Sequence, residues 1–198
     1  MKNVVIDIEK ERLEILKRYR KLLRTAKPFL KDDDAKQIKK AFLLSAEAHK
    51  DMRRKSGEPY ILHPLAVAKI VAEEIGLGTT AVICALLHDV VEDTEITLGD
   101  IQREFGNNVA KIVDGLTKIK GVFDVTSSEQ AENFRKIVLT MAEDIRVILI
   151  KIADRLHNMR TLESMSRQKQ MRIASETVYL YAPLAHRLGL YNIKSELE

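Results

Sequence analysis

Apolar residues recur along this chain mostly at spacings of three and four, the period that places them on one face of a helix. No segment alternates apolar and polar residues clearly enough to predict a strand or a hairpin. Glycine and proline are sparse, at 8 and 4 residues, which favours long helices over many turns. The pattern therefore predicts an all-α fold. The expected helices span residues 8–25, 35–50, 64–75, 79–91, 97–105, 107–118, 128–142, 145–159 and 167–188.

Turn-forming residues indicate where these helices should stop. Residues 53–63 contain both a glycine and a proline and are expected to form a loop, as are residues 121–128. Thr97 and Asp100 have the spacing of a capping box, which starts a helix. Pro183 lies within the last expected helix and should kink it, because proline has no backbone N–H to donate.

Length and charge limit the classes of partner. A chain of 198 residues suits one domain, with or without an appendage. The 33 basic and 29 acidic residues give a net charge of +4, which suits an anionic small molecule without requiring nucleic acid. Aromatic residues make up 5% with no tryptophan, so stacking platforms for single-stranded nucleic acid are not expected.

The single cysteine, Cys84, lies inside an apolar segment and is expected to be a small buried hydrophobe. One thiol permits no disulfide within the chain, which agrees with a reducing cytoplasm. The N-terminus is charged throughout and lacks the apolar region of a signal peptide. No stretch approaches the roughly 18 uninterrupted apolar residues of a membrane span. We therefore expect a cytoplasmic protein without membrane contact.

The segment LLHDVVEDT, residues 86–94, places four ionisable side chains at the end of an apolar helix. The preceding AVICALL is expected to be buried, so these groups emerge where charge is costly. They are His88, Asp89, Glu92 and Asp93. A buried charge is strongly unfavourable unless it is paired or bound to a metal ion. One metal ion is the simplest single partner for so many acceptors.

Two distant segments supply further ligands. His63 directly precedes Pro64, where a helix should begin, and Asp154 leaves another apolar helical run. An adjacent His-Asp pair flanked by a distant His and a distant Asp is typical of the HD metal-phosphohydrolases. The mixed nitrogen and oxygen ligands suit manganese or iron better than a thiolate-rich zinc site. The pattern predicts an HD-type helical bundle with a metal site at its centre.

Residues four apart share a helix face, so Glu92 and Asp93 should stand one turn beyond His88 and Asp89. From there a carboxylate can accept or return a proton during hydrolysis. The alternative interpretation is an acid cluster at a helix end that pairs with basic neighbours.

Asp154 and Asn158 repeat the four-residue spacing, so Asn158 could donate to or accept from a substrate. Arg155 and Arg160 beside them fit either substrate binding or ordinary surface ion pairs. His157 is expected to be a structural histidine rather than a ligand.

A basic run, residues 53–55, is followed by Ser56 and Gly57 shortly before His63. Lysine binds phosphate as a point charge, whereas arginine offers a planar fork that also stacks on a base. A charge run is usually a solvated face, but the position just ahead of His63 favours nucleotide binding.

Four longer motifs resemble the N-terminal hydrolase domain of the RelA/SpoT family: AHKDMRRKSGEPYILHPLAVA, LLHDVVEDT, ILIKIADRLHNMRTL and YAPLAHRLGLYNIKSELE. The resemblance covers nearly the whole chain from about residue 35. It implies a manganese-dependent hydrolase of the alarmone (p)ppGpp. Such an enzyme removes pyrophosphate from the ribose 3′ position and gives GDP or GTP.

The resemblance also implies roles for individual residues. The implied Mn²⁺ ligands are His63, His88, Asp89 and Asp154. The implied pair that activates and positions water is Glu92 and Asp93. The implied nucleotide pocket contains Arg54, Lys55, Ser56, Asn158 and Thr161, with Arg54 against the guanine. Relatives that only synthesise the alarmone lack the His-Asp and Glu-Asp pairs, which this chain retains.

The resemblance further suggests how the chain is divided. Residues 1–30 would form a helix that packs on the domain, residues 31–180 the HD-type hydrolase domain, and residues 181–198 the start of a helical linker toward a synthetase domain. The last residues continue an uncapped helical pattern, so we expect more protein to follow, and the resemblance implies synthetase and regulatory domains in the native protein.

Two other functions fit parts of the pattern. One is a non-catalytic regulatory domain that binds (p)ppGpp, which the intact Glu92 and Asp93 disfavour. The other is an HD phosphohydrolase of another nucleotide, which the RRKSGEPY loop disfavours.

Overall fold

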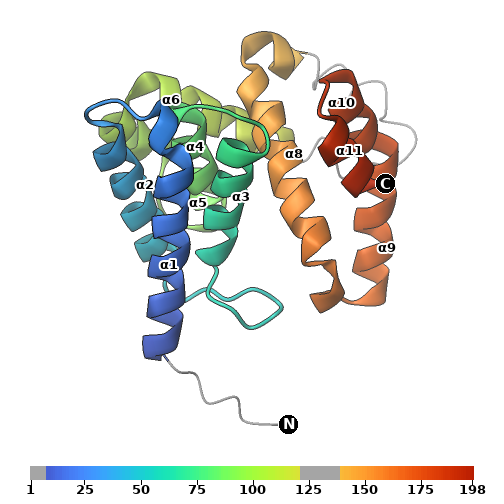
Figure 1. The fold of residues 1–198 in the computed structure, drawn as a ribbon, viewed down its shortest axis with the longest axis horizontal. Coiled ribbons are helices and arrows are strands. Elements are labelled where there is room, and N and C mark those ends of the chain that lie inside the picture. Colours follow the sequence, from blue (N-terminus) through green and yellow to red (C-terminus); the bar gives the residue numbers. More distant parts are fainter. Residues whose placement is uncertain (1–7, 121–138) are drawn as a thin grey trace.

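The structure, a computed structural model, describes residues 8–120 and 139–198, and the regular elements in these ranges are helices (Figure 1). The α-helices are α1 (Ile8–Ala26), α2 (Asp34–Ala48), α3 (Leu62–Glu73), α4 (Thr79–Leu87), α5 (Val90–Asp93), α6 (Leu98–Lys120), α8 (Ile145–Arg160), α9 (Arg167–Glu176), α10 (Ala182–Arg187) and α11 (Tyr191–Leu197). Two 3₁₀ turns, Lys27–Phe29 and Leu162–Ser164, and a π-helical segment, Thr177–Tyr181, join some of them. The predicted all-α class is confirmed.

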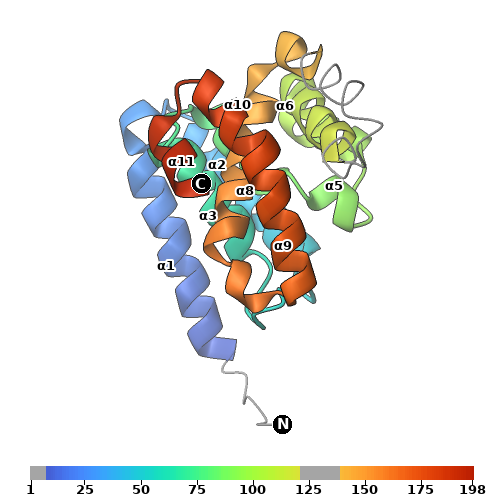
Figure 2. The same cartoon turned by 90° about the vertical axis from the view of Figure 1, so that its right-hand side faces the viewer.

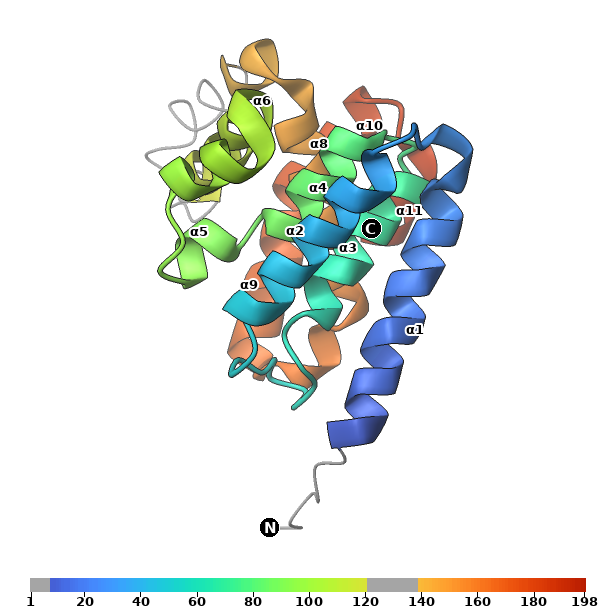
Figure 3. The ribbon, with the colours of Figure 1, turned by 90° about the vertical axis from the view of Figure 1, so that its left-hand side faces the viewer.

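Helices α3 and α4 form the centre of the core. They pack against each other, α1 and α8 pack against α3, and α2 packs against α4. Figure 3 shows α2, α3 and α4 side by side, with α1 along their edge. All residues of α4 from Ala81 to Leu87 are buried, as is most of α3. A helix that is apolar on every face must lie inside the protein, which explains these central positions.

The expected helix over residues 79–91 is divided in two. Helix α4 ends at Leu87 and α5 begins at Val90, so the prediction of one continuous helix is wrong. No glycine or proline lies at this break. It falls instead at His88 and Asp89, whose side chains contact other parts of the chain. The turn persists locally, because Asp93 N–H donates to the Asp89 carbonyl at 2.9 Å.

The capping box before α6 is confirmed. Thr97 N–H donates to Asp100 Oδ2 at 3.0 Å, and Asp100 N–H donates to Thr97 Oγ1 at 3.2 Å. Gly106, with a φ of +83°, interrupts α6 at the boundary between the two expected helices. The loop expected at residues 121–128 lies outside the described residues. So does most of the helix expected at 128–142, of which the described part from 139 is helical.

The C-terminal helices differ from the single kinked helix expected over residues 167–188. Helix α9 ends at Glu176, the π-helical segment follows, and Pro183 stands in the first turn of α10. Proline cannot donate to the carbonyl four residues earlier, so the irregular turn lies just before it. Figures 1 and 2 both show α9 beside α8, which positions the wall of a cavity described below.

Both end segments of the described chain pack on the core. Helix α1 buries Leu22 and Ala26, and α11 buries Ile193 and Leu197. The division of the chain at residues 30 and 180 stays a prediction. Within the described ranges, no helix combines the length and the apolar content that crossing a membrane requires.

Candidate metal centre and substrate cavities

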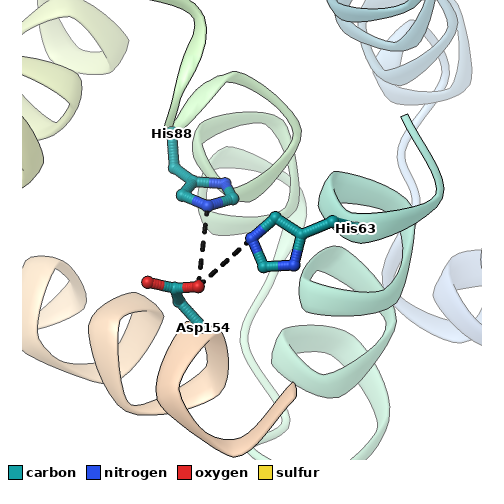
Figure 4. A group of neighbouring side chains, drawn as sticks. All are labelled: His63, His88 and Asp154. Carbon is teal, nitrogen blue, oxygen red and sulfur yellow. Dashed lines mark ion pairs between the residues drawn. The ribbon is translucent and has the colours of Figure 1, made fainter. Parts of the chain in front are cut away.

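Three helices converge on a cluster of polar side chains. His63 lies in the first turn of α3, His88 follows the last residue of α4, and Asp154 lies in α8. Figure 4 shows both imidazole rings turned toward the carboxylate of Asp154. Asp89, the residue after His88, joins the same cluster from the start of α5.

The distances within the cluster are those of groups that share a small space. His63 Nε2 lies 3.2 Å from Asp154 Oδ1, and His88 Nε2 lies 3.9 Å from the same oxygen. Asp89 Oδ2 lies 3.0 Å from His88 Nε2 and 3.7 Å from His63 Nε2. Among the described residues, donor atoms of His63, His88 and Asp154 lie within 4.8 Å of one another. The four predicted ligands are therefore brought together.

The donor atoms of the cluster fit a divalent cation. His88 is fully buried, and its Nδ1 lies 2.8 Å from the carbonyl oxygen of Ala85. That carbonyl can only accept, so the proton of a neutral His88 ring stays on Nδ1 and leaves Nε2 with a free lone pair. His88 Nε2 is buried without a hydrogen-bond partner among the described residues. A buried lone pair beside two carboxylates is the arrangement that a metal ion satisfies.

The carboxylates of the cluster stay ionised. Burial alone would raise the pKa of Asp89, but the neighbouring His88 and His63 hold it well below its usual range. Burial opposes ionisation of Asp154 too, and the hydrogen bond from His63 with the charges around it lowers its pKa. Burial lowers the pKa of His63. Burial also opposes the charge on His88, but the neighbouring Asp89 and Asp154 raise its pKa. The carboxylates thus have the charged form that metal ligands require, and a divalent ion would displace the proton from His88.

Two cavities adjoin the cluster, and Asp89, Asp154, Asn158 and Met165 line both. The first, of about 360 Å³, extends between α8 and α9 and is lined by Lys151, Arg155, Lys169, Arg172, Ile173, Glu176 and Tyr181. The second, of about 320 Å³, extends toward the loop before α3 and is lined by Arg53, Arg54, Lys55, Tyr60, His63, Asp93 and Ser164. Both walls are rich in cations, so both suit an anionic ligand.

The basic loop adopts a tight turn beside the second cavity. Gly57 N–H donates to the Arg54 carbonyl at 2.9 Å, and the φ of +87° at Gly57 is one that glycine adopts readily. Arg54 reaches α8, where one guanidinium nitrogen donates to Asn158 Oδ1 at 3.0 Å and to Thr161 Oγ1 at 3.2 Å. Lys55 lines the cavity, whereas Ser56 is exposed at the turn.

Asn158 connects this loop to the cluster. Its side-chain amide donates to Asp154 Oδ1 at 2.8 Å and accepts from Arg54. The predicted pocket residues Arg54, Asn158 and Thr161 therefore form one hydrogen-bonded chain that ends at a candidate metal ligand.

The two expected catalytic acids occupy different places. Asp93 lines the second cavity, and its Oδ2 accepts from the Tyr60 hydroxyl at 3.2 Å. The carboxylate oxygens of Glu92 are buried, and Glu92 is not among the residues that line either of the two cavities. The Tyr60 hydroxyl lies nearer to Asp89 than to Asp93, and it donates to Asp89 Oδ2 at 2.6 Å.

The HD domain family matches residues 41–191 of this sequence. This chain belongs to the HD domain family. The polar cluster and both cavities lie within the matched range.

Relatives of this HD domain have names that concern guanosine nucleotides. A protein of Escherichia coli K12 named bifunctional (p)ppGpp synthase/hydrolase SpoT is 52% identical over 171 residues, 86% of this chain and 24% of that protein. A Myxococcus xanthus protein named GTP pyrophosphokinase is 51% identical over 179 residues, 88% of this chain and 23% of that protein. The chain spans about a quarter of the length of these relatives.

A solved structure shares the fold. Its title reads "A metazoan ortholog of SpoT hydrolyzes ppGpp and plays a role in starvation responses". The TM-score is 0.55 at 26% identity, over 71% of this chain and 84% of that one. The resemblance to the RelA/SpoT family and the predicted HD-type bundle are confirmed.

Sequence reasoning missed two residues of this HD domain. Lys151 is 5% exposed and lines the first cavity beside Asp89 and Asp154. Its charge lowers the pKa of Asp154, and no carboxylate of the described residues forms an ion pair with it. Tyr60 bridges Asp89 and Asp93. Lys151 could have been noticed in the sequence because it stands inside the apolar run VILIKIAD. No feature of the sequence distinguished Tyr60.

The structure also shows the contacts of Arg155 and Arg160, for which the sequence allowed either substrate binding or surface ion pairs. Arg155 forms an ion pair with Glu176 at 2.9 Å, lies over the ring of Tyr181 at 4.3 Å and lines the first cavity. Arg160 lies in surface ion pairs away from both cavities.

Proposed function

We propose that this chain is a guanosine-3′,5′-bis(diphosphate) 3′-pyrophosphohydrolase, which cleaves (p)ppGpp into pyrophosphate and GDP or GTP. The observation that carries the proposal is the buried His-His-Asp cluster at the junction of two cation-lined cavities. A nucleotide with phosphate groups on both the 3′ and the 5′ position of its ribose matches cation-lined cavities that meet at one reaction centre. The names of the relatives support the same substrate.

The metal that we propose is Mn²⁺, held by His63, His88, Asp89 and Asp154. Two imidazole nitrogens and two carboxylates form a ligand set without thiolate, which suits manganese better than structural zinc. When bound, a divalent ion of this kind polarises a phosphate oxygen and lowers the pKa of a coordinated water.

Asp93 is the group placed best to move a proton. It lines the second cavity beside Asp89, and its carboxylate is a hydrogen-bond acceptor without a role in the donor cluster. Tyr60 holds Asp89 and Asp93 in fixed relation through its hydroxyl. We assign Glu92 to the same water-positioning pair, acting from α5, where its carboxylate oxygens are buried.

The cations of the two cavities would bind different parts of the substrate. Arg54 and Lys55, with Ser56 at the turn, would hold the guanine end, supported by Asn158 and Thr161. Lys151, a buried cation that forms no ion pair among the described residues, would bind a phosphate close to the reacting phosphorus. An anion in the cavity offsets the cost of burying that charge.

Other parts of the prediction also stay proposals. We propose that the native protein carries synthetase and regulatory domains, since the chain spans about a quarter of its curated relatives. We keep the expectation of a cytoplasmic location, a nucleotide ligand, and no direct contact with nucleic acid or membrane.

The deciding experiment is turnover with the purified chain. We expect ppGpp with Mn²⁺ to give GDP and pyrophosphate in equal amounts, measured by ³¹P NMR, and EDTA to stop the reaction. His88→Ala is the matched control, because it removes a candidate ligand without touching either cavity wall.

The two alternatives give different results in the same assay. Tight ppGpp binding by calorimetry without product would favour the regulatory domain. Faster release of phosphate or pyrophosphate from another nucleotide in a substrate panel would favour an HD phosphohydrolase of different specificity.

A further inference from the structure

His63 is held by hydrogen-bonding groups at both of its ring nitrogens. Its Nε2 lies 3.2 Å from Asp154 Oδ1, and Figure 4 shows this nitrogen directed at the carboxylate. Its Nδ1 lies 2.8 Å from Nδ1 of His157, which is also buried. Asp154 and His157 are three residues apart on α8, so they occupy one face of that helix. One helix therefore contacts both sides of a ring that α3 supplies.

The contact between the two histidines decides where the proton of His63 lies. A neutral imidazole carries one N–H, and a nitrogen that binds metal must be unprotonated. If Nε2 of His63 binds the ion, its proton is on Nδ1 and must be donated to His157 Nδ1. The opposite arrangement, with His157 donating, puts the proton of His63 on Nε2 and blocks that nitrogen as a ligand.

We propose that His157 is a positioning residue for the metal: it accepts the Nδ1 proton of His63 and so holds that ring in its metal-binding tautomer and orientation. The proposal rests on the metal site of the proposed function and gives a role to a residue that sequence reasoning assigned to structure alone. His157 contacts the ligand and not the reacting atoms.

The other candidate ligand shows why this contact matters. His88 Nδ1 donates to a backbone carbonyl, that of Ala85, which can only accept. The tautomer of His88 is therefore fixed by the backbone and survives any side-chain substitution. The Nδ1 proton of His63 is instead accepted by a side chain, that of His157, so one mutation can alter the tautomer of His63. Partners of this kind typically change metal affinity by about 10- to 100-fold when they are removed.

The test measures Mn²⁺ binding alone, by calorimetry, on the full chain and on two variants. His157→Leu keeps an apolar side chain in the space but removes the acceptor. His157→Asn keeps an acceptor oxygen near the position of Nδ1. We expect the leucine variant to bind Mn²⁺ about 10- to 100-fold more weakly. We expect the asparagine variant to stay within about threefold of wild type. Thr177→Val, a buried polar-to-apolar change on another helix that contacts no candidate ligand, is the control.

A second readout reports the tautomer directly. Long-range ¹H–¹⁵N NMR of the protein loaded with Zn²⁺, a diamagnetic ion in place of Mn²⁺, should show the proton of His63 on Nδ1 in wild type and in His157→Asn. Melting curves in EDTA show whether each variant folds. If the leucine variant does not fold, the asparagine variant and the wild-type tautomer still decide the question.

Three results would overturn the proposal. They are unchanged Mn²⁺ affinity in a folded His157→Leu, equal weakening in the leucine and asparagine variants, and an Nε2-protonated His63 in metal-loaded wild type. Failure of the proposed function looks different, because wild type would then bind Mn²⁺ with the His157 dependence intact and release no pyrophosphate from ppGpp.

Discussion

Helices α3 and α8 are joined by ionisable side chains at two places, and the two places differ in burial. At the start of α3, buried His63 contacts Asp154. At its end, Glu74 accepts two hydrogen bonds from Arg160, at 2.8 and 2.9 Å, and Arg160 also pairs with Glu196 of α11. Side-chain exposure is 3% for His63 and 35% for Arg160.

The difference separates a functional cluster from a structural one. Each group of the surface network has an oppositely charged partner and remains near water, so the network contributes little to the free energy of folding. The buried cluster brings two carboxylates and two imidazoles together with one ring nitrogen left unpartnered. Such an arrangement is unfavourable for folding unless a ligand completes it.

Removal of a candidate ligand should have the largest effect. We expect His88→Ala and Asp89→Ala to lose Mn²⁺ and to reduce pyrophosphate release below detection, because no other described side chain takes the place of either donor. Metal content by atomic emission and turnover are measured on the same preparations. Wild-type turnover in either variant would remove that residue from the metal site.

Removal of a proton acceptor should reduce turnover without loss of the metal. Asp93→Asn and Glu92→Gln preserve shape and remove the charge, and we expect kcat to fall by about 10²–10⁴-fold. Metal content and calorimetric ppGpp affinity should stay within a few-fold of wild type. Normal kcat in both variants would leave this pair as a structural acid cluster.

Removal of the buried cation should have an intermediate effect. Lys151→Met keeps the length of the side chain and removes the charge. Hydrogen bonds to charged groups contribute about 1.5–3 kcal/mol, so kcat/KM should fall by about 10- to 150-fold. Steady-state kinetics measure this loss, and Lys169→Met on the same cavity wall is a comparison nearer the surface. Unaltered kcat/KM in Lys151→Met would place no phosphate at this residue.

Removal of the loop arginine should weaken substrate binding alone. Stacking of a guanidinium on a base contributes about 0.5–2 kcal/mol, so Arg54→Ala should raise KM by about 2- to 30-fold. Metal content should not change, because Arg54 reaches the cluster only through Asn158. An unchanged KM for ppGpp would exclude the loop from the binding site.

Disruption of the surface network should have the smallest effect. We expect Glu196→Gln to destabilise the fold by about 0.2–1 kcal/mol, less at high salt, because exposed ion pairs are screened. Chemical denaturation at low and high salt measures the change, and turnover should match wild type. A large loss of activity would show that the contact between α8 and α11 supports the site and would weaken the contrast drawn above.

Sequence alone determined the helices, the polar cluster and the family. Periodic apolar residues predicted the helices to within a few residues at most boundaries, because burial of one face is a local requirement. The run LLHDVVEDT was recognisable for the same reason, since ionisable groups inside an apolar pattern are costly. Together with His63 and Asp154, it predicted a ligand set whose members the fold brings within contact distance.

Only the tertiary structure decided what surrounds that cluster. The bridge from Tyr60 to Asp89 and the pairing of His63 with His157 each join segments far apart in the chain. The break at His88 has no glycine or proline to announce it in the sequence. Lys151 interrupts an apolar run in the sequence, and only the packing of α9 beside α8 places it in a cavity. Contacts of this kind depend on the distance and orientation between helices, which side-chain packing sets and sequence periodicity does not encode.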